Sequence, residues 1–264
     1  MKSKFKRLTT KLKSALERAQ KSIRPHEWEE RFFAGAPPAF LDFMSRYFRL
    51  SCEGFDQIPR RGPAIFVANH SGFSGLDAMI LTYQIRQLTG RVVRVMTHHL
   101  WFKTKFTAAR ANKLGFVEAK LQNGIKFLKK KQAVLIFPEG ELGNFKPSSQ
   151  AYELQEFKRG FIRMALECEA PIIPILVLGA EEANINLKQI DLPLGLKRII
   201  LPLPLNFLPL PSKWKIKVLP PIQLPYSTQS LNDSELMMEL ADEIRIKMQT
   251  ALNFELSRRG GVFF

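Results

Sequence analysis

The sequence predicts an α/β protein, in which a mixed, largely parallel sheet is flanked by helices, with a basic amphipathic helix at the N-terminus and a long helix at the C-terminus. Three observations lead to this prediction. Short apolar runs alternate with helical patterns, an order typical of a parallel or mixed sheet covered by helices. The 264 residues are 45% hydrophobic and 24% charged, close to an ordinary globular protein, which excludes a disordered or collagen-like chain. Half of the formal net charge of +16 lies in the first 24 residues.

The N-terminal segment, residues 1–24, is predicted to be a basic amphipathic helix. It holds nine Lys or Arg residues and one Glu, a surplus of eight positive charges. Its apolar residues recur at steps of three and four and form one stripe: Phe5, Leu8, Leu12, Leu16, Ala19 and Ile23. Such a helix suits the surface of an anionic bilayer; the alternative is a solvated helix that docks its stripe on the domain. Lys and Arg interrupt every apolar core, so no signal peptide is predicted.

The body of the protein is expected to follow a connector over residues 25–49 and to form a single α/β domain over residues 50–264. Four apolar, β-rich runs predict buried strands: Ala64–Ala68, Val92–Met96, Ala133–Phe137 and Ile172–Leu178. Three helical patterns lie between them: Leu76–Leu88, Leu121–Lys131 and Leu154–Cys168.

Three further segments complete the predicted fold. Trp214–Leu219 alternates polar and apolar residues, which predicts an edge strand. Residues 234–257 predict one long helix, with candidate caps at Asn232, Asp233 and Ser234. The apolar run Ile199–Pro211 has a proline spacing that excludes a regular helix, so it is expected to be extended and either packed under the domain or dipped into lipid. No apolar run reaches the ~20 residues of a transmembrane helix.

Two predicted strands run directly into polar sequences. The first is followed by NHSGFSGLD (69–77), and the third by PEGE (138–141). In an open α/β sheet, residues just after the carboxyl ends of strands line the ligand crevice. If these two strands are parallel neighbours, His70, Asp77 and Glu139 converge on one edge of the sheet.

His70 and Asp77 predict a general base with its orienting acid. On a continuous helix, seven positions correspond to about 10.5 Å, so contact requires a loop, which Gly72 and Gly75 permit. A helix beginning near Gly75 then presents Asp77 in its first turn. A carboxylate beside an imidazole fixes the tautomer and makes the other ring nitrogen a better proton acceptor. The alternatives are a capping pattern, Ser74-x-x-Asp77, and a hydrogen-bonded loop histidine.

Other chemistries have weaker support. Ser71 or Ser74 would be a nucleophile beside the histidine, but neither lies in a G-x-S-x-G elbow. His98 and His99 would suggest a metal, yet neighbours on one strand point to opposite faces and no carboxylate follows at ligand spacing. Two cysteines are too few for a disulfide framework or a cysteine-based metal cluster, which favours a reducing compartment. No metal or cofactor site is predicted.

Four motifs stand in a characteristic order along residues 55–221. They are Asn69-His70 with Asp77, FPEG (137–140), PIIPI (171–175), and the longer stretch over residues 157–183. This series resembles the glycerolipid acyltransferase superfamily, the lysophosphatidic acid acyltransferase-like proteins. One motif alone would be weak, whereas four in the right order are specific.

The resemblance implies acyl transfer. His70 would act as general base on an acceptor hydroxyl, with Asp77 orienting it, and the hydroxyl would attack an acyl thioester directly. A thiol leaves, so no covalent acyl-enzyme is required. Glu139 and Gly140 would bind or position the acceptor, while nearby backbone N–H groups stabilise the oxyanion.

The sequence departs from the family pattern in three places, of which the first concerns the loop between His70 and Asp77 and the other two concern the acceptor. The spacing from His70 to Asp77 is two residues longer than usual, Leu142 stands where an arginine is common, and the middle block over residues 115–120 has Lys120 as its cation. An acceptor phosphate would therefore need other basic residues, each of which is otherwise part of a solvated face. The candidates are Lys120, Lys146, Lys158 and Arg159.

The expected function is a membrane-associated O-acyltransferase that moves a fatty acyl group from acyl-CoA or acyl-carrier protein to the hydroxyl of a lysophospholipid in glycerophospholipid synthesis. The alternatives are a neutral mono- or diacylglycerol acceptor, and a non-catalytic protein that binds anionic lipid. The expected location is peripheral, on the cytoplasmic face of a membrane, and the expected partners are the anionic membrane surface, the lipid acceptor and the acyl donor. Nucleic acid is not expected as a partner, because no binding module is recognisable.

Overall fold

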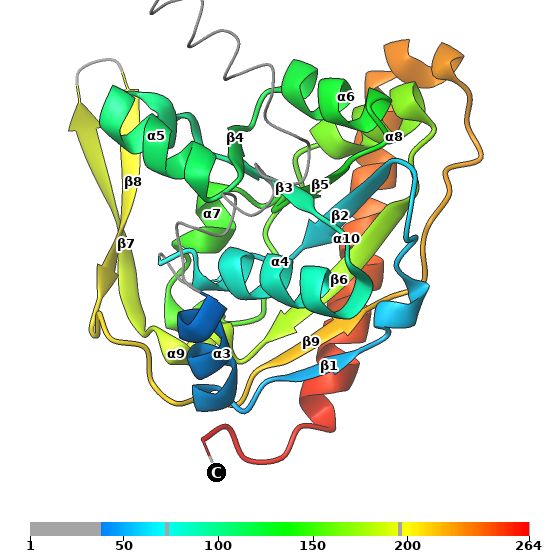
Figure 1. Ribbon diagram of the computed structural model, residues 1–264. Helices are drawn as coiled ribbons and strands as arrows, with labels where there is room; N and C mark the ends of the chain where they lie inside the picture. The colour runs from blue at the N-terminus through cyan, green and yellow to red at the C-terminus, as the bar shows by residue number, and fades with distance from the viewer. Residues whose placement is uncertain (1–37, 72–73, 195–196, 264) are drawn as a thin grey trace, which may run out of the picture.

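The computed structural model of the protein describes residues 38–71, 74–194 and 197–263 (Figure 1). The basic helix predicted over residues 1–24 and the first part of the predicted connector lie outside these residues. The second part of that connector contains helix α3, Pro38–Tyr47, whose Leu41 and Met44 are buried in the core.

The centre of the fold is a seven-stranded sheet in the order β1-β9-β6-β2-β5-β3-β4. The strands are β1 Ser51–Glu53, β2 Ala64–Ala68, β3 Val93–Thr97, β4 Phe116–Glu118, β5 Ala133–Ile136, β6 Ile172–Leu178 and β9 Lys215–Val218. All neighbouring pairs are parallel except β6 and β9, so the sheet is mixed and largely parallel, as predicted. The four predicted strands are confirmed, with ends that differ by at most one residue.

Strand β9 corrects one prediction, because it does not lie at an edge of the sheet. The short strand β1 pairs with its outer side, from Ser51 to Glu53. The polar residues that give β9 its alternating pattern, Lys215 and Lys217, form ion pairs with Glu255 rather than facing open solvent. The alternation of polar and apolar residues in β9 therefore reflects a cluster of ion pairs and not an exposed edge of the sheet.

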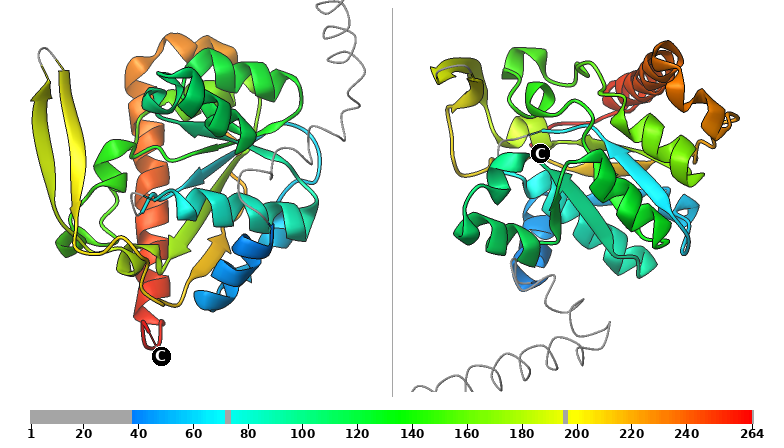
Figure 2. Two further views of the ribbon diagram at one scale, coloured as in Figure 1. Left: turned by 60° about the vertical axis from the view of Figure 1, so that its left-hand side comes forward. Right: turned by 90° about the horizontal axis from the view of Figure 1, so that it is seen from above.

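Helices cover both faces of the sheet (Figures 1 and 2). The helices after α3 are α4 Leu76–Thr89, α5 Lys105–Lys113, α6 Leu121–Lys129, α7 Glu141–Asn144, α8 Gly160–Cys168, α9 Ala180–Ala183 and α10 Ser234–Ser257. Central strand β2 is wholly buried, and Phe66 packs in the core with α3 and α4, whereas Ile65 and Val67 pack in the core with α8 and α10. Asp233 caps α10, with its side chain accepting from the Leu236 N–H.

Helix α8 is shorter than the pattern over Leu154–Cys168 predicts, because it begins at Gly160. Leu154 and Phe157 are buried and give the sequence its helical periodicity. However, the backbone N–H groups before α8 are used by distant acceptors, since Gln155 N–H donates to Glu139 Oε2 and Lys158 N–H to the Pro138 carbonyl. Residues 153–159 therefore form a connection that crosses the end of β5.

A two-stranded antiparallel ribbon stands apart from the main sheet (Figure 2). It consists of β7 Asn186–Leu194 and β8 Lys197–Pro204. Ile199–Pro211 thus forms most of β8 and the loop after it, extended as predicted. Several of its side chains are exposed, so this segment is not packed under the domain. No helix within the described ranges is both long and apolar enough to cross a membrane.

Candidate active site

The site forms where two adjacent parallel strands end. Strands β2 and β5 pair in register, with Val67 opposite Ile136. The segments that follow them therefore leave the sheet at the same edge. This places His70 and Glu139 beside one another, as the strand-end argument predicts.

Asn69 fixes the chain as it leaves β2. Its side-chain amide Nδ2 donates to the Val177 carbonyl (2.9 Å), and its Oδ1 accepts from the Val177 N–H (2.8 Å). Both bonds are buried, and they continue the pairing with β6 by a side chain after the strand has ended. The residue before the histidine is consequently tied to the middle of the sheet.

His70 and Asp77 are in direct contact. His70 Nδ1 and Asp77 Oδ2 lie 2.6 Å apart, and the intervening segment turns back through Gly75, whose φ of 71° suits glycine. Asp77 is fully buried in the first turn of α4, where its carboxylate also accepts from the N–H groups of Ser71 (3.1 Å) and Ala78 (2.8 Å). Because Nδ1 is engaged, Nε2 is the ring nitrogen left for a substrate.

The imidazole is held on its face as well as at its edge. The Phe137 ring stacks on it, with 4.1 Å between ring centroids and 24° between planes. The His70 side chain keeps 16% of its surface exposed, whereas the Asp77 side chain has none. The arrangement is a partly accessible histidine backed by a buried acid, which suits general-base chemistry.

Glu139 joins two parts of the site and has no exposed surface. Its Oε1 accepts from the His70 N–H (3.1 Å), and its Oε2 accepts from the Gln155 N–H (2.8 Å). Gly143 makes room for it, since a Cβ there would lie 2.5 Å from the Glu139 Cβ and 2.8 Å from Oε2. The carboxylate therefore fixes the backbone of the histidine and that of residues 153–159.

Lys146 is buried among carboxylates. Its Nζ lies 3.0 Å from Glu181 Oε1 and 3.9 Å from Glu139 Oε2, and it donates to the Glu153 carbonyl (3.1 Å). Burial raises the pKa of Glu181 to about 7, although Lys146 opposes this shift. The positive charge of Lys146 is thus largely balanced within the protein.

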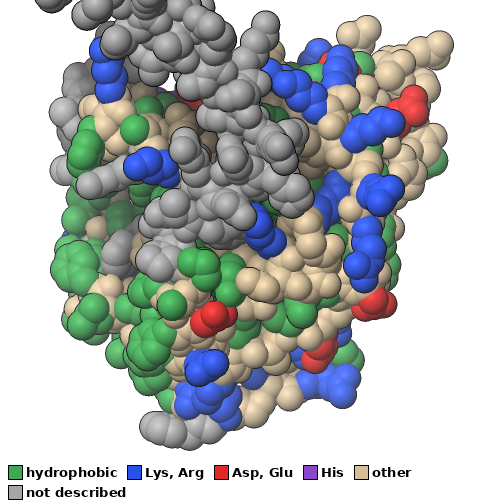
Figure 3. Space-filling model, in the orientation of Figure 1, with side chains coloured by type: hydrophobic (Ala, Val, Ile, Leu, Met, Phe, Trp, Pro, Cys, Tyr) green, Lys and Arg blue, Asp and Glu red, His purple; other side chains and the backbone are tan. Residues whose placement is uncertain are grey.

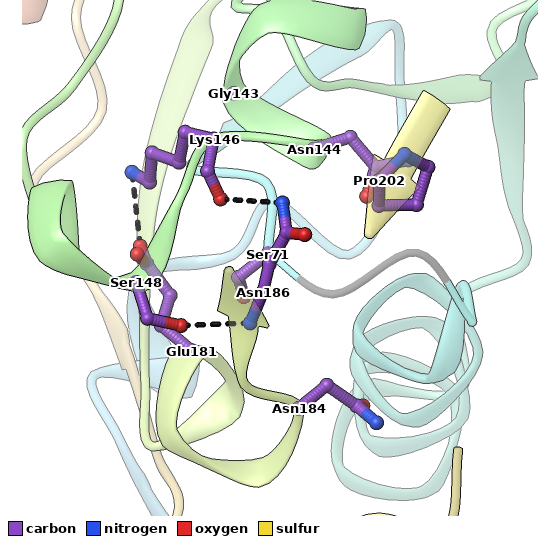
Figure 4. Close-up of a pocket in the computed structure, with 9 residues that line it drawn as sticks. All are labelled: Ser71, Gly143, Asn144, Lys146, Ser148, Glu181, Asn184, Asn186 and Pro202. Atoms are coloured by element: carbon purple, nitrogen blue, oxygen red, sulfur yellow. Dashed lines mark hydrogen bonds and ion pairs between the residues drawn. The ribbon is translucent and has the colours of Figure 1, made fainter. Parts of the chain in front are cut away.

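A small polar cavity of about 20 Å³ opens beside these groups (Figure 4). The residues lining it include Ser71, Asn144, Lys146, Glu181, Asn186 and Pro202. Ser71 Oγ and Asn144 Oδ1 are buried and lack hydrogen-bond partners among the described residues. The cavity has space for a water molecule or one hydroxyl group, and its lining is mostly neutral and polar.

The remaining sequence candidates lie in different surroundings. Lys120 is exposed and pairs with Glu118 at 2.8 Å, and Arg159 bonds to Ser234 at the start of α10. In the part of the chain that the structure describes, neither forms a hydrogen bond or ion pair with His70, Asp77 or Glu139. Gly140 lies close to the remaining candidate, Lys158, because a Cβ at Gly140 would be 2.9 Å from Lys158 Nζ.

Lys158 and Arg159 also line a larger groove of about 510 Å³ that runs toward α10. Glu156 and Asp242 line the same groove, so its charges are mixed. The groove is connected to the Pro138–Gly140 segment through Lys158, which lines the groove and whose N–H donates to the Pro138 carbonyl. It is the larger of the two cavities described here.

The two adjacent histidines correct a second prediction. Strand β3 ends at Thr97, so His98 and His99 do not point to opposite faces of a strand; their rings lie 4.0 Å apart. His98 Nε2 pairs with Glu141 Oε1 at 2.6 Å, and burial lowers the pKa of His98 in spite of this partner. No group of three or more His, Cys, Asp or Glu side chains among the described residues has the geometry to hold a metal.

The sequence prediction gave no role to several residues of the site. Asn69, Phe137 and Gln155 position the histidine and Glu139, while Glu181 neutralises Lys146. Glu181 follows β6, the parallel neighbour of β2, so the same strand-end argument applied to β6 would have found it. No local signal points to Gln155, because only its backbone takes part.

The fold and this site define a class of enzyme, the acyltransferases. The family model described as Acyltransferase matches residues 49–178, which include the histidine, the paired acid and the FPEG segment. The chain belongs to this family.

Curated relatives and a solved structure are also similar to this chain. Uncharacterized proteins of Mycobacterium bovis and Mycobacterium tuberculosis are each 31% identical over 240 residues, covering 86% of this chain and 67% of theirs. The crystal structure of the 1-acyl-sn-glycerophosphate (LPA) acyltransferase PlsC from Thermotoga maritima has a TM-score of 0.56 at 17% identity, with 95% of this chain and 90% of that one covered. The protein therefore shares the fold of that acyltransferase.

Proposed function

We propose that the protein transfers a fatty acyl group from an acyl-CoA or acyl-carrier-protein thioester to the hydroxyl of a lysophospholipid at a membrane surface, as a step of glycerophospholipid synthesis. The observation that carries the proposal is the 2.6 Å contact between His70 Nδ1 and buried Asp77. It supports a histidine whose free Nε2 accepts a proton from an acceptor alcohol.

The proposed step needs one base and no covalent enzyme intermediate. Nε2 of His70 takes the proton as the acceptor oxygen attacks the thioester carbonyl carbon. The tetrahedral intermediate collapses, the carbon–sulfur bond breaks, and the imidazolium returns the proton to the leaving thiolate. Asp77 stabilises the imidazolium, and the backbone N–H groups that follow Gly140 are candidates to stabilise the oxyanion. The step as written uses no metal or cofactor.

We assign Glu139 and Gly140 different parts in this reaction. Because Glu139 is fully buried and bonded to two backbone N–H groups, it acts by positioning His70. Gly140 and the neighbouring Lys158 are nearer to the surface and are the better candidates for contact with a substrate. The groove beside Lys158 is the candidate place for the acyl donor.

A neutral acceptor, such as a mono- or diacylglycerol, is a second candidate that one observation favours. Lys146, the cation at the small cavity, is balanced by Glu139 and Glu181. Leu142 occupies the position where the family resemblance leads us to expect an arginine. A phosphorylated acceptor would then depend on Lys158.

The peripheral location follows from the same proposal. A lipid acceptor resides in a bilayer, so the enzyme has to work at that surface. The basic segment over residues 1–24 would provide attraction to anionic lipid on the cytoplasmic face, where each basic residue contributes about 1 kcal/mol.

The test is acyl transfer from a labelled thioester, as acyl-CoA and as acyl-carrier protein, to a panel of lysophospholipids and neutral acylglycerols. We expect His70→Ala to lower turnover at least about 100-fold, the scale of a lost general base. His99→Ala, which removes an exposed histidine, is the matched control and should retain activity. Equal activity of wild type and His70→Ala would remove His70 from the mechanism, and transfer only to neutral acceptors would establish the second candidate.

A further inference from the structure

The outer face of the β7–β8 ribbon is apolar and continues beyond the end of β8. From Leu201 onward, exposure alternates with sequence position. The outward-facing positions are all large and apolar: Leu201, Leu203, Leu205 and Phe207. The positions between them are less exposed, and one of these, Pro202, lines the small cavity beside Ser71. One side of this segment therefore faces the candidate site and the other faces outward.

The loop after β8 exposes large apolar side chains, and the Asn206 side chain bonds to several backbone groups in and around it. Phe207 is 77% exposed and Leu208 is 84% exposed. Asn206 holds the loop from inside, because its Oδ1 accepts from the Ile185 N–H and its Nδ2 donates to the carbonyls of Ala183 (2.9 Å) and Leu208 (2.7 Å). The flanking prolines have no N–H to satisfy. Each of these features lowers the number of polar groups that would lose water when the loop enters an apolar environment.

Helix α3 extends this apolar region. Tyr47 donates its hydroxyl to the Pro209 carbonyl (2.8 Å), and the Phe43 ring stacks on Tyr47 with 6.2 Å between centroids. Phe43 is itself 61% exposed. In Figure 3, hydrophobic side chains gather on the side of the molecule that carries the ribbon and α3. We call this region, from Leu201 to Leu208 together with Phe43, the apolar surface.

Basic residues border the apolar surface. Arg46 and Arg49 are exposed at the end of α3, and Lys188 is exposed on β7. Asp42 on α3 and Asp191 on β7 are exposed acids in the same region. Residues 1–24, which carry a surplus of eight positive charges, precede α3 in the sequence and are separated from it by residues 25–37. Large apolar side chains framed by cations match a bilayer with anionic headgroups.

We propose that the apolar surface docks on an anionic lipid bilayer, with Phe207 and Leu208 entering the interface. This inference rests on the proposed function, in which the acceptor is a lipid, and it adds a docking element distinct from residues 1–24. Pro202 lies on the inner side of the same segment, against the cavity next to His70. A lipid leaving the bilayer at the apolar surface would therefore have a short route to the site.

The test compares two double substitutions in the full-length protein. Phe207→Ser with Leu208→Ser removes apolar surface without adding charge, and we expect partitioning onto phosphatidylglycerol/phosphatidylcholine vesicles to fall at least ten-fold. Ile246→Ser with Phe254→Ser is the matched control, because both side chains are about half exposed, at 51% and 52%, but lie on α10. The control should partition like wild type.

Three outcomes would overturn the proposal. The first is unchanged partitioning of the Phe207→Ser/Leu208→Ser protein. The second is a wild-type dimer by light scattering that becomes monomeric in this variant, which would identify a second copy as the occupant. The third is that deletion of residues 1–24 abolishes partitioning onto vesicles and that adding Phe207→Ser and Leu208→Ser to the deleted protein lowers it no further. That result would show that residues 1–24 carry the binding.

Vesicle binding is measured without turnover, so it is separable from the proposed function. His70→Ala should partition normally even though it does not transfer acyl groups. If wild type binds vesicles through the apolar surface but transfers no acyl group to any acceptor, the proposed function fails and the docking surface stands.

Discussion

Replacing Glu139 with glutamine tests whether this residue positions the histidine or binds the acceptor. The carboxylate accepts one hydrogen bond at each oxygen, from the N–H groups of His70 and Gln155. Glutamine retains one acceptor oxygen and presents an NH₂ group to the other N–H. One buried donor is then left without a partner, and the mean position of the His70 backbone shifts.

The magnitude follows from the burial of the site. A hydrogen bond to a charged group contributes about 1.5–3 kcal/mol, and water cannot replace the lost partner because Glu139 has no exposed surface. We expect the free energy of unfolding to fall by about 1.5–3 kcal/mol, which corresponds to a decrease in Tm of roughly 4–10 °C. If the same energy is lost from the transition state, kcat falls about 10- to 100-fold.

The assay is steady-state kinetics with acceptor varied at saturating thioester, together with thermal unfolding. A positioning residue lowers kcat and Tm while the KM for acceptor changes little. Glu141→Gln is the control from the same motif, since its carboxylate pairs with a partly exposed His98 and should contribute less than about 1 kcal/mol. A ten-fold higher KM with unchanged kcat and Tm would refute this reasoning and make Glu139 an acceptor-binding residue.

Two other predictions address the acids near the site. Asp77→Asn should lower kcat by about 10²–10⁴-fold, because an amide does not stabilise the imidazolium and favours the wrong tautomer; wild-type turnover across a pH profile would contradict this role. Burial raises the pKa of Glu181 from its usual 4.5 to about 7, so the folded protein keeps a proton that the unfolded chain releases. The free energy of unfolding should therefore decrease, by at most about 3 kcal/mol, as pH rises from about 4.5 to 7. In urea unfolding at several pH values, the Glu181→Gln protein should not show this decrease. The same dependence of unfolding free energy on pH in both proteins would contradict the prediction.

The sequence predicts the part of the site that depends on strand order. The sequence predicts that the segments after Ala68 and Ile136 meet if their strands are parallel neighbours, which they are, and that the glycines permit the turn that brings Asp77 back to His70. These relations rest on strand identity, strand order and glycine positions. The buried strands are similarly clear, because their apolar runs are short and bounded by turn residues.

The sequence does not predict features that depend on distant partners. Residues 153–159 have helical periodicity, but their N–H groups bond to acceptors elsewhere, including Glu139 and Gln249. Strand β1 is three residues long, which is too short for a periodic signal, so β9 was expected at the edge. The neutralisation of Lys146 likewise depends on Glu181, a residue 35 positions further along the chain.

The two hydrogen bonds between Asn69 and Val177 separate the part of the site that holds the base from the parts that surround the substrate. These bonds tie the residue before the base to the central strand β6, so the position of His70 is set by the core of the sheet. Adaptation to a different acyl chain or acceptor therefore falls to the surrounding loops and the ribbon. Evolution or design can vary these elements and change what is acylated while the proton-transfer apparatus stays as it is.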